Sequence, residues 1–155
     1  MIKNYELVEL LKLKKLKVST AESITGGKLI SKLIEVPGAS NVTEQSYIVY
    51  SDQAKVNVLN VNNKTIDEFG VVSEEVALDM ARNLKKMSNA NIAISTTGEA
   101  GPSLGSKGAQ IGEVYICIIV ESKEFIYKKF FNGDRMGIID DTVTFIVNEL
   151  YNLIN

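Results

Sequence analysis

Apolar residues recur at helical spacing in several parts of the chain. The segment Tyr5–Lys17 carries leucines at positions 7, 10 and 11 on one face and lysines and glutamates on the other, which predicts an amphipathic helix. The same kind of pattern predicts helices that begin around Ser23 and run to Glu35, follow an N-cap at Ser51, cover Asn62–Phe69, open at Ser73 with Val76, Met80 and Leu84 buried, and cover Met136–Ile154.

Short apolar runs bounded by polar residues or glycine predict strands between these helices. These runs are Val18–Thr20, Tyr47–Tyr50, Ala90–Ser95, Val114–Val120 and Glu124–Phe131, with a Gly-rich loop at Gly105–Gly112. The last two strands are joined by a tight connection through Glu121 and Ser122, which indicates a hairpin. Helices that alternate with strands early and a hairpin late predict a three-layer α/β/α sandwich around a mixed sheet, folded as one domain over residues 1–155.

Charge and hydrophobicity limit the partners that the protein is expected to have. The net charge of −2 gives no electrostatic footprint for nucleic acid, and the lysines of LKLKKLK are expected on a solvated helix face. No apolar run approaches the ~20 residues of a membrane span, so no membrane partner is expected. The first ten residues contain two glutamates and no continuous apolar core, unlike a signal peptide, so we expect a cytoplasmic protein.

The chain has no histidine and a single cysteine, Cys117, which lies inside an apolar run and is expected in the core. Ser-His-Asp and Cys-His catalysis and histidine-ligated metal sites are therefore excluded. Asp140 and Asp141 could bind Mg²⁺ weakly, but no spacing indicates a dedicated metal site, and no cofactor is expected. Any catalysis must use carboxylates, lysine, hydroxyls or backbone amides.

Three polar loops follow predicted strands: Thr20–Gly27, Tyr50–Lys55 and Thr96–Gly101. Ligands bind at the carboxyl ends of strands in open α/β sheets, so these loops could line one crevice. Each loop alone is better explained as a helix cap or a wide turn, and only the three together favour a site. Amides at the helix start after Thr20–Gly27 could hold an anion or an oxyanion.

Lys55 is a candidate general base. If Ser51 caps the next helix, Lys55 lies in the first turn, near the positive end of the helix dipole. A partly buried ammonium group in that place would have a lowered pKa, as a general base requires. The alternative is a lysine that extends to solvent.

These loops resemble those of the CinA C-terminal domain family, the nicotinamide-mononucleotide deamidases. The matching stretches are TAESITGG (20–27), VPGAS (36–40), YSDQAK (50–55), GVVSEEVA (70–77), TGEAGP (97–102), GEVYI (112–116) and FNGDR (131–135). The resemblance implies hydrolysis of the carboxamide of nicotinamide mononucleotide to nicotinate mononucleotide and ammonia, in pyridine-nucleotide salvage. It also implies the stand-alone form of the family, without the N-terminal molybdopterin-binding-like domain, and a homodimer or larger homo-oligomer.

The resemblance also assigns roles to individual residues. It implies Ser23 as nucleophile, Lys55 as its base and Tyr50 as support for the pair, with substrate contacts from Thr25, Gly26, Gly27, Thr97, Gly98 and Arg135. Backbone amides in Thr25–Gly27 are the expected oxyanion donors, and Arg135 is expected either to bind the phosphate or to act as a cation in the active site.

Three positions depart from the family pattern, namely Ile24, Glu99 and Glu113, and the two glutamates add negative charge near an anionic substrate. Glu99 and Glu113 support an alternative function. In this alternative the protein is a non-catalytic member of the family that binds a nucleotide or a partner protein in a competence or DNA-damage pathway.

Overall fold

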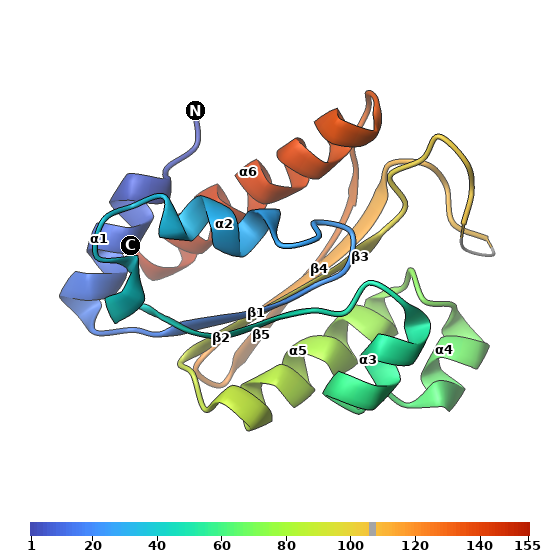
Figure 1. Cartoon of the computed structure of the whole chain (residues 1–155), viewed down its shortest axis with the longest axis horizontal. Coiled ribbons are helices and arrows are strands. Elements are labelled where there is room, and N and C mark those ends of the chain that lie inside the picture. The colour runs from blue at the N-terminus through green and yellow to red at the C-terminus, as the bar shows by residue number, and fades with distance from the viewer. Residues whose placement is uncertain (106–107) are drawn as a thin grey trace.

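A five-stranded mixed sheet forms the middle layer of the molecule (Figure 1). The computed structural model describes residues 1–105 and 108–155. Across the sheet the strands are ordered β2 (Thr43–Ile48), β1 (Val18–Glu22), β3 (Ile92–Gly98), β4 (Glu113–Val120) and β5 (Lys123–Phe130). Strand β1 is parallel to β2 and β3, whereas β4 is antiparallel to β3 and β5. The carboxyl ends of β1, β2 and β3 therefore meet at one edge.

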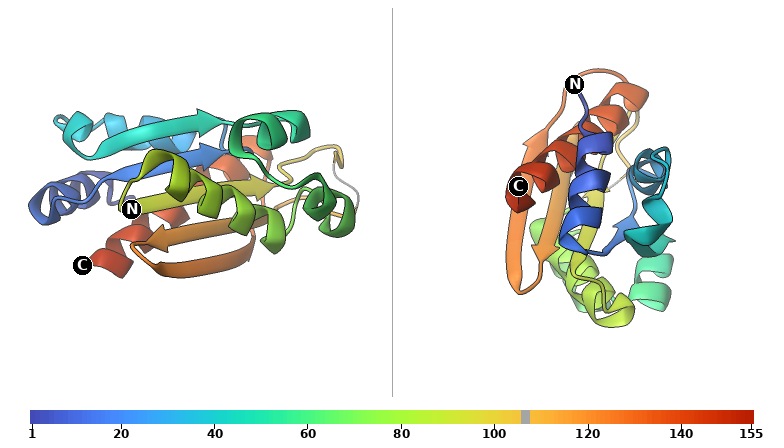
Figure 2. Two further views of the ribbon diagram at one scale, coloured as in Figure 1. Left: turned by 90° about the horizontal axis from the view of Figure 1, so that it is seen from below. Right: turned by 90° about the vertical axis from the view of Figure 1, so that its left-hand side faces the viewer.

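Helices cover both faces of the sheet, which confirms the predicted three-layer fold. One face carries α1 (Asn4–Lys14), α2 (Lys28–Ile34) and α6 (Arg135–Ile154), and the other carries α3 (Asp52–Leu59), α4 (Asn63–Phe69) and α5 (Glu74–Ser88) (Figures 1 and 2). A short 3₁₀ helix, η1 (Ala39–Asn41), leads into β2. No helix in the described part of the chain is long and apolar enough to cross a membrane.

Buried apolar side chains form two cores, one on each face of the sheet, and the helices contribute to them through residues at helical spacing. Val76, Met80 and Leu84 of α5 are buried against the sheet, as predicted. Ser51 and Ser73 cap α3 and α5, because their hydroxyls accept hydrogen bonds from the amides of Ala54 and Val76.

The two central parallel strands are buried along almost their whole length, yet they carry several hydroxyl side chains: Ser19, Thr20, Ser95, Thr96 and Thr97. Buried hydroxyls need partners, and those near the strand ends build the site described below.

Several predicted boundaries were wrong. The helix expected to begin around Ser23 begins at Lys28, because residues 23–27 form a turn. The strand expected at Tyr47–Tyr50 is Thr43–Ile48, a polar edge strand that pairs with β1 instead of filling the core. The hairpin is confirmed, with Glu121 in the left-handed conformation at its turn. Two positions of the predicted Gly-rich loop, residues 106 and 107, lie outside the described residues.

Candidate active site

A pocket of about 260 Å³ lies where the carboxyl ends of β1, β2 and β3 meet. Its wall brings together the three polar loops, and the start of α6 adds Arg135 from the end of the chain. Six of the nine candidate residues line this pocket: Ser23, Tyr50, Lys55, Thr97, Gly98 and Arg135. Sequence-distant segments thus meet at the edge that the parallel strands define.

Ser23 and Lys55 are in direct contact inside this pocket. The Nζ atom of Lys55 lies 3.0 Å from the Oγ atom of Ser23. Lys55 projects inward from the first turn of α3, and its side chain is only 1% exposed, which excludes the alternative of a solvent-directed lysine. Its Nζ atom also donates to the backbone carbonyls of Val49, at 3.0 Å, and Tyr50, at 3.2 Å.

Burial changes the ionisation of Lys55. Desolvation lowers the pKa of Lys55 from 10.5 to about 8, and the nearby carboxylate of Asp52 opposes this shift by favouring the charged form. Among the described residues no carboxylate oxygen lies within ion-pair distance of its Nζ atom. A substantial fraction of this amine is therefore neutral near pH 8, and only a neutral amine can accept a proton.

Tyr50 contacts the Ser23–Lys55 pair through its backbone carbonyl, whereas its phenol contacts Arg135. Its carbonyl oxygen accepts from Lys55 and lies 3.4 Å from the Ser23 hydroxyl. Its side chain is exposed, and the phenol oxygen accepts a 2.8 Å hydrogen bond from Arg135. Arg135 also donates to the carbonyl of Gly101 at 2.6 Å. The guanidinium group is thus held at the rim of the pocket by two fixed acceptors.

Thr97 and Gly98 form the wall that faces Ser23 at the end of β3. The hydroxyl of Thr97 donates to the carbonyl of Val71 and ties the segment before α5 to the sheet. Gly98 allows close packing, because a Cβ atom there would lie 2.9 Å from both the Glu113 carbonyl and the Ile24 side chain. The tight approach brings Ile24 into the pocket wall beside Ser23.

Thr25, Gly26 and Gly27 do not line the pocket, so their predicted role in substrate binding is not supported. The amide of Gly26 donates to the Ser23 carbonyl, and the amide of Gly27 donates to the carboxylate of Glu22. The hydroxyl of Thr25 also donates to Glu22. A completely buried carboxylate requires several donors, and Glu22 takes those at the start of α2 that were expected to hold an oxyanion.

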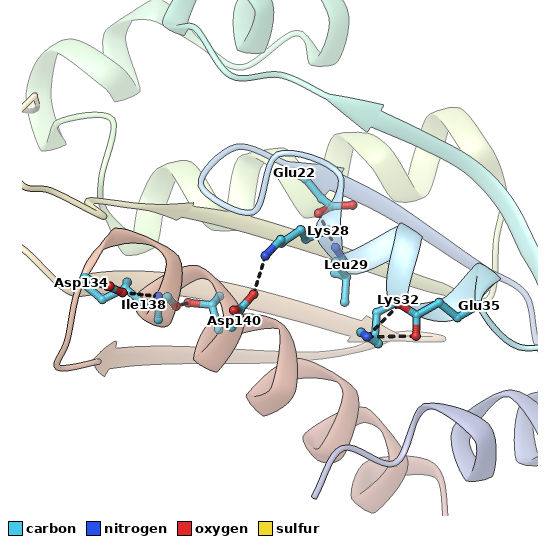
Figure 3. Close-up of polar contacts among 10 residues, drawn as sticks. Glu22, Lys28, Leu29, Lys32, Glu35, Asp134, Ile138 and Asp140 are labelled. Carbon is cyan, nitrogen blue, oxygen red and sulfur yellow. Dashed lines mark hydrogen bonds and ion pairs between the residues drawn. The ribbon is translucent and has the colours of Figure 1, made fainter.

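Glu22 is the residue that the sequence interpretation missed. Its carboxylate faces the start of α2, where it accepts from the amide of Leu29 (Figure 3). Next to this contact the ion pair of Lys28 with Asp140 joins α2 to α6. The available signal was an acidic residue at the end of a buried strand, followed by a hydroxyl and two glycines that begin a helix.

Glu99 and Glu113 hold the loop between β3 and β4. The Glu99 carboxylate lines the pocket and accepts from the amide of Gly105. The Glu113 carboxylate lies outside this pocket and accepts from the amide of Gln110 and the phenol of Tyr115. Both unusual glutamates therefore have a local role in the loop that borders the site.

Metal-binding residues do not gather in the described residues, which contain no cluster of three or more histidine, cysteine, aspartate or glutamate side chains placed to hold an ion. Cys117 is buried in β4, as predicted, and burial raises the pKa of its thiol to about 12. A thiol in that environment is a core side chain and not a nucleophile.

The protein is of the α/β class, with a mixed five-stranded sheet and a buried contact between Ser23 and Lys55 at the carboxyl ends of its parallel strands. The CinA C-terminal domain model matches residues 3–154, and the chain belongs to that family. It is similar to a competence-damage inducible protein of Clostridium botulinum, with 46% identity over 129 residues, and to a CinA-like protein of Petrotoga mobilis, with 45% identity over 118 residues. These matches cover 83% and 76% of this chain but only 32% and 29% of the relatives.

Solved structures agree with this assignment. A CinA superfamily protein from Enterobacter cloacae superposes with a TM-score of 0.93 at 29% identity, covering 100% of this chain and 94% of that one. The competence/damage inducible protein CihA from Agrobacterium tumefaciens gives a TM-score of 0.89 at 32% identity, covering 98% and 96%. The chain spans about a third of the length of the curated relatives it matches and nearly the whole of these solved chains.

Proposed function

We propose that this protein hydrolyses the carboxamide of nicotinamide mononucleotide to nicotinate mononucleotide and ammonia, with Ser23 as nucleophile and Lys55 as general base. The observation that carries the proposal is the 3.0 Å contact between Ser23 Oγ and the buried Nζ of Lys55, whose pKa is lowered to about 8. In a chain without histidine, a neutral lysine is one of the few groups able to activate a hydroxyl.

The hydrogen bonds of Lys55 orient its lone pair. A neutral amine has two N–H donors and one lone pair. The carbonyls of Val49 and Tyr50, at 3.0 and 3.2 Å, lie closer to Nζ than the carbonyl of Ser51 at 3.5 Å and accept the two donors, so the lone pair is left for the Ser23 hydroxyl. When Lys55 is charged, it donates its third proton to Ser23 Oγ instead. Loss of one proton thus converts the contact from a donor to an acceptor, and the pair becomes competent for general-base catalysis.

The reaction then follows from these contacts. Lys55 takes the hydroxyl proton while Ser23 Oγ bonds to the carboxamide carbon, giving a tetrahedral intermediate. Lys55 returns this proton to the nitrogen, the carbon–nitrogen bond breaks, and ammonia leaves. Water attacks the resulting acyl-serine by the reverse route, with Lys55 as base, and releases the nicotinate product and free Ser23.

The oxyanion requires a donor other than the glycine amides. The amides of Ser23, Gly26 and Gly27 already donate to acceptors inside the protein. The amides of Ile24 and Thr25 have no acceptor among residues 1–105 and 108–155, and of these two residues only Ile24 lines the pocket. We therefore assign the Ile24 amide as an oxyanion donor, for which a loss of about 2.7–4 kcal/mol is typical when one donor is removed.

Arg135 is the proposed ligand for the 5′-phosphate of the substrate. Two of its five N–H donors bind Tyr50 and Gly101, which fixes the guanidinium plane and leaves the other donors for phosphate oxygens. The charge of Glu99 in the pocket wall opposes a second anion nearby. The phosphate is therefore expected at the rim, beside Arg135, with the carboxamide directed inward toward Ser23.

Ammonia release tests the proposal directly. The assay compares nicotinamide mononucleotide, nicotinamide riboside and nicotinamide as substrates of the wild type, S23A and K55A, with K64A as an exposed-lysine control. We expect turnover of the mononucleotide to fall by at least ~10³-fold in S23A and K55A and to persist in K64A. Unchanged turnover in S23A or K55A would refute the dyad. Tight mononucleotide binding without ammonia release would favour the alternative, a non-catalytic family member that binds a nucleotide.

A further inference from the structure

We propose that Glu22, Thr25 and Thr96 form a directed hydrogen-bond chain that positions the nucleophile Ser23, an inference that rests on the proposed function of that serine. The chain starts at a buried carboxylate, passes through two buried hydroxyls and ends on the backbone amide of Ser23. The three side chains that form it lie outside the pocket wall, so they are positioning residues and not substrate ligands.

The carboxylate of Glu22 anchors the chain. It is completely buried and accepts from five groups, which are the hydroxyls of Thr20 and Thr25 and the amides of Gly27, Leu29 and Ile30. Oε1 accepts from the amides of Gly27 and Leu29 and Oε2 accepts from the amide of Ile30, so the hydroxyl of Thr25 is the donor in its contact with Oε1.

The direction of the chain follows from the number of protons. The single hydroxyl proton of Thr25 points to Glu22 Oε1, at 2.6 Å. Thr25 Oγ1 must therefore accept in its 3.0 Å contact with Thr96 Oγ1, and Thr96 must donate. With its proton used, Thr96 Oγ1 accepts from the amide of Ser23, at 3.2 Å. Each hydroxyl therefore donates in one bond and accepts in the next, so the bonds run in one direction between Ser23 and the Glu22 carboxyl group.

This arrangement constrains the backbone of Ser23. The amide of Ser23 also donates to the Thr96 carbonyl, at 3.1 Å, and is therefore turned toward β3. With its backbone fixed to β3, the residue directs Oγ to the Nζ atom of Lys55 on α3. A loss of the chain loosens the distance between Oγ and Nζ without touching the substrate, so it should lower kcat and leave KM unchanged.

Isosteric variants of the two threonines separate the hydroxyls from the packing. Thr25→Val and Thr96→Val keep the side-chain volume and remove the hydroxyl, whereas Thr25→Ser and Thr96→Ser keep it. Thr142→Val is the matched control, because Thr142 is also fully buried and its hydroxyl donates within α6, to Ile138. Glu22 is left unchanged, since it also holds the start of α2.

Two readouts keep this inference separate from the identity of the substrate. The first is kcat and KM for nicotinamide mononucleotide. The second is the rate at which a fluorophosphonate probe labels Ser23, forming a phosphorus–oxygen bond and releasing fluoride. We expect each valine variant to lose about 10-fold in kcat and in labelling rate, with unchanged KM and with a pH midpoint that stays near the pKa of about 8 of Lys55.

The pattern across variants decides the outcome. Serine variants and Thr142→Val should behave like the wild type, and the double valine variant should be no slower than the slower single variant, because either loss interrupts the same chain. Labelling without ammonia release would refute the substrate but not the chain. Wild-type rates in both valine variants, serine variants as slow as valine variants, fully additive losses, or a wild-type Ser23 that the probe does not label would each overturn the chain.

Discussion

The lowered pKa of Lys55 makes the stability of the protein depend on pH in a way that one substitution can isolate. Lys55→Met removes the titrating amine while retaining a long side chain. The unfolded lysine has a pKa of 10.5 and the folded one about 8, because burial disfavours the charge. That difference corresponds to about 3.4 kcal/mol, at about 1.36 kcal/mol for each pKa unit.

The sign of the effect follows from proton uptake. Below about pH 8 Lys55 is charged in both states, and the folded state carries the full cost of desolvation. Between about pH 8 and 10.5 the unfolded chain binds more protons than the folded chain, so wild-type stability rises with pH relative to Lys55→Met. From pH 7 to pH 10 the difference between the two proteins should change by about 2.5 kcal/mol in favour of the wild type.

Urea denaturation followed by far-UV circular dichroism measures this difference at each pH. Tyrosines and the other lysines titrate in both proteins and cancel when the free energies of unfolding are subtracted. Lys64→Met serves as the control, because Lys64 is exposed on α4 and its replacement should change stability by the same amount at every pH. Wild-type and Lys55→Met curves that stay parallel from pH 7 to 10 would refute the lowered pKa and, with it, the supply of neutral amine.

Three further outcomes are expected. Asp52→Asn should move the midpoint of the kcat/KM profile to lower pH, since the Asp52 carboxylate raises the pKa of Lys55; an unmoved midpoint in kinetics from pH 6 to 10 would contradict this. Gly98→Ala should lower the free energy of unfolding, measured by urea denaturation, by about 1–3 kcal/mol, because its Cβ would lie 2.9 Å from the Glu113 carbonyl. An unchanged urea midpoint would show that the backbone at Glu113 shifts to make room for the methyl group. Arg135→Lys should raise KM for the mononucleotide about 10-fold and leave the riboside nearly unaffected, whereas equal losses for both substrates would exclude a phosphate contact.

Local patterns in the sequence were sufficient for the helices and their caps. Helical periodicity identified the buried face of α5, and Ser51 and Ser73 identified two helix starts, because these features depend on neighbours within one or two turns. The edge strand β2 could not be located in this way. Its sequence TEQSYI is polar and largely exposed, and only its pairing with β1 makes it a strand.

The same division applies to the candidate site. The absence of histidine restricted the possible bases, and Lys55 in a first helical turn was recognisable as a candidate from local sequence. Whether its amine reached Ser23 depended on the parallel pairing of β1 with β2, which brings Ser23 and α3 to the same sheet edge. Burial among the surrounding loops then set its pKa, a quantity that no local pattern contains.

The segment TAESITGG shows most clearly which features the sequence determines alone and which depend on the tertiary structure. By itself it determined a polar loop between a strand and a helix, but it indicated a helix start near Ser23 and not at Lys28. Tertiary structure decided where its donors point, because the buried Glu22 carboxylate had to be satisfied and took the hydroxyl and amides that a ligand could otherwise have used. The hydroxyl of Thr25 also contacts the hydroxyl of Thr96, which lies 71 residues further along the chain. Contacts at that separation exist only once β1 and β3 have paired.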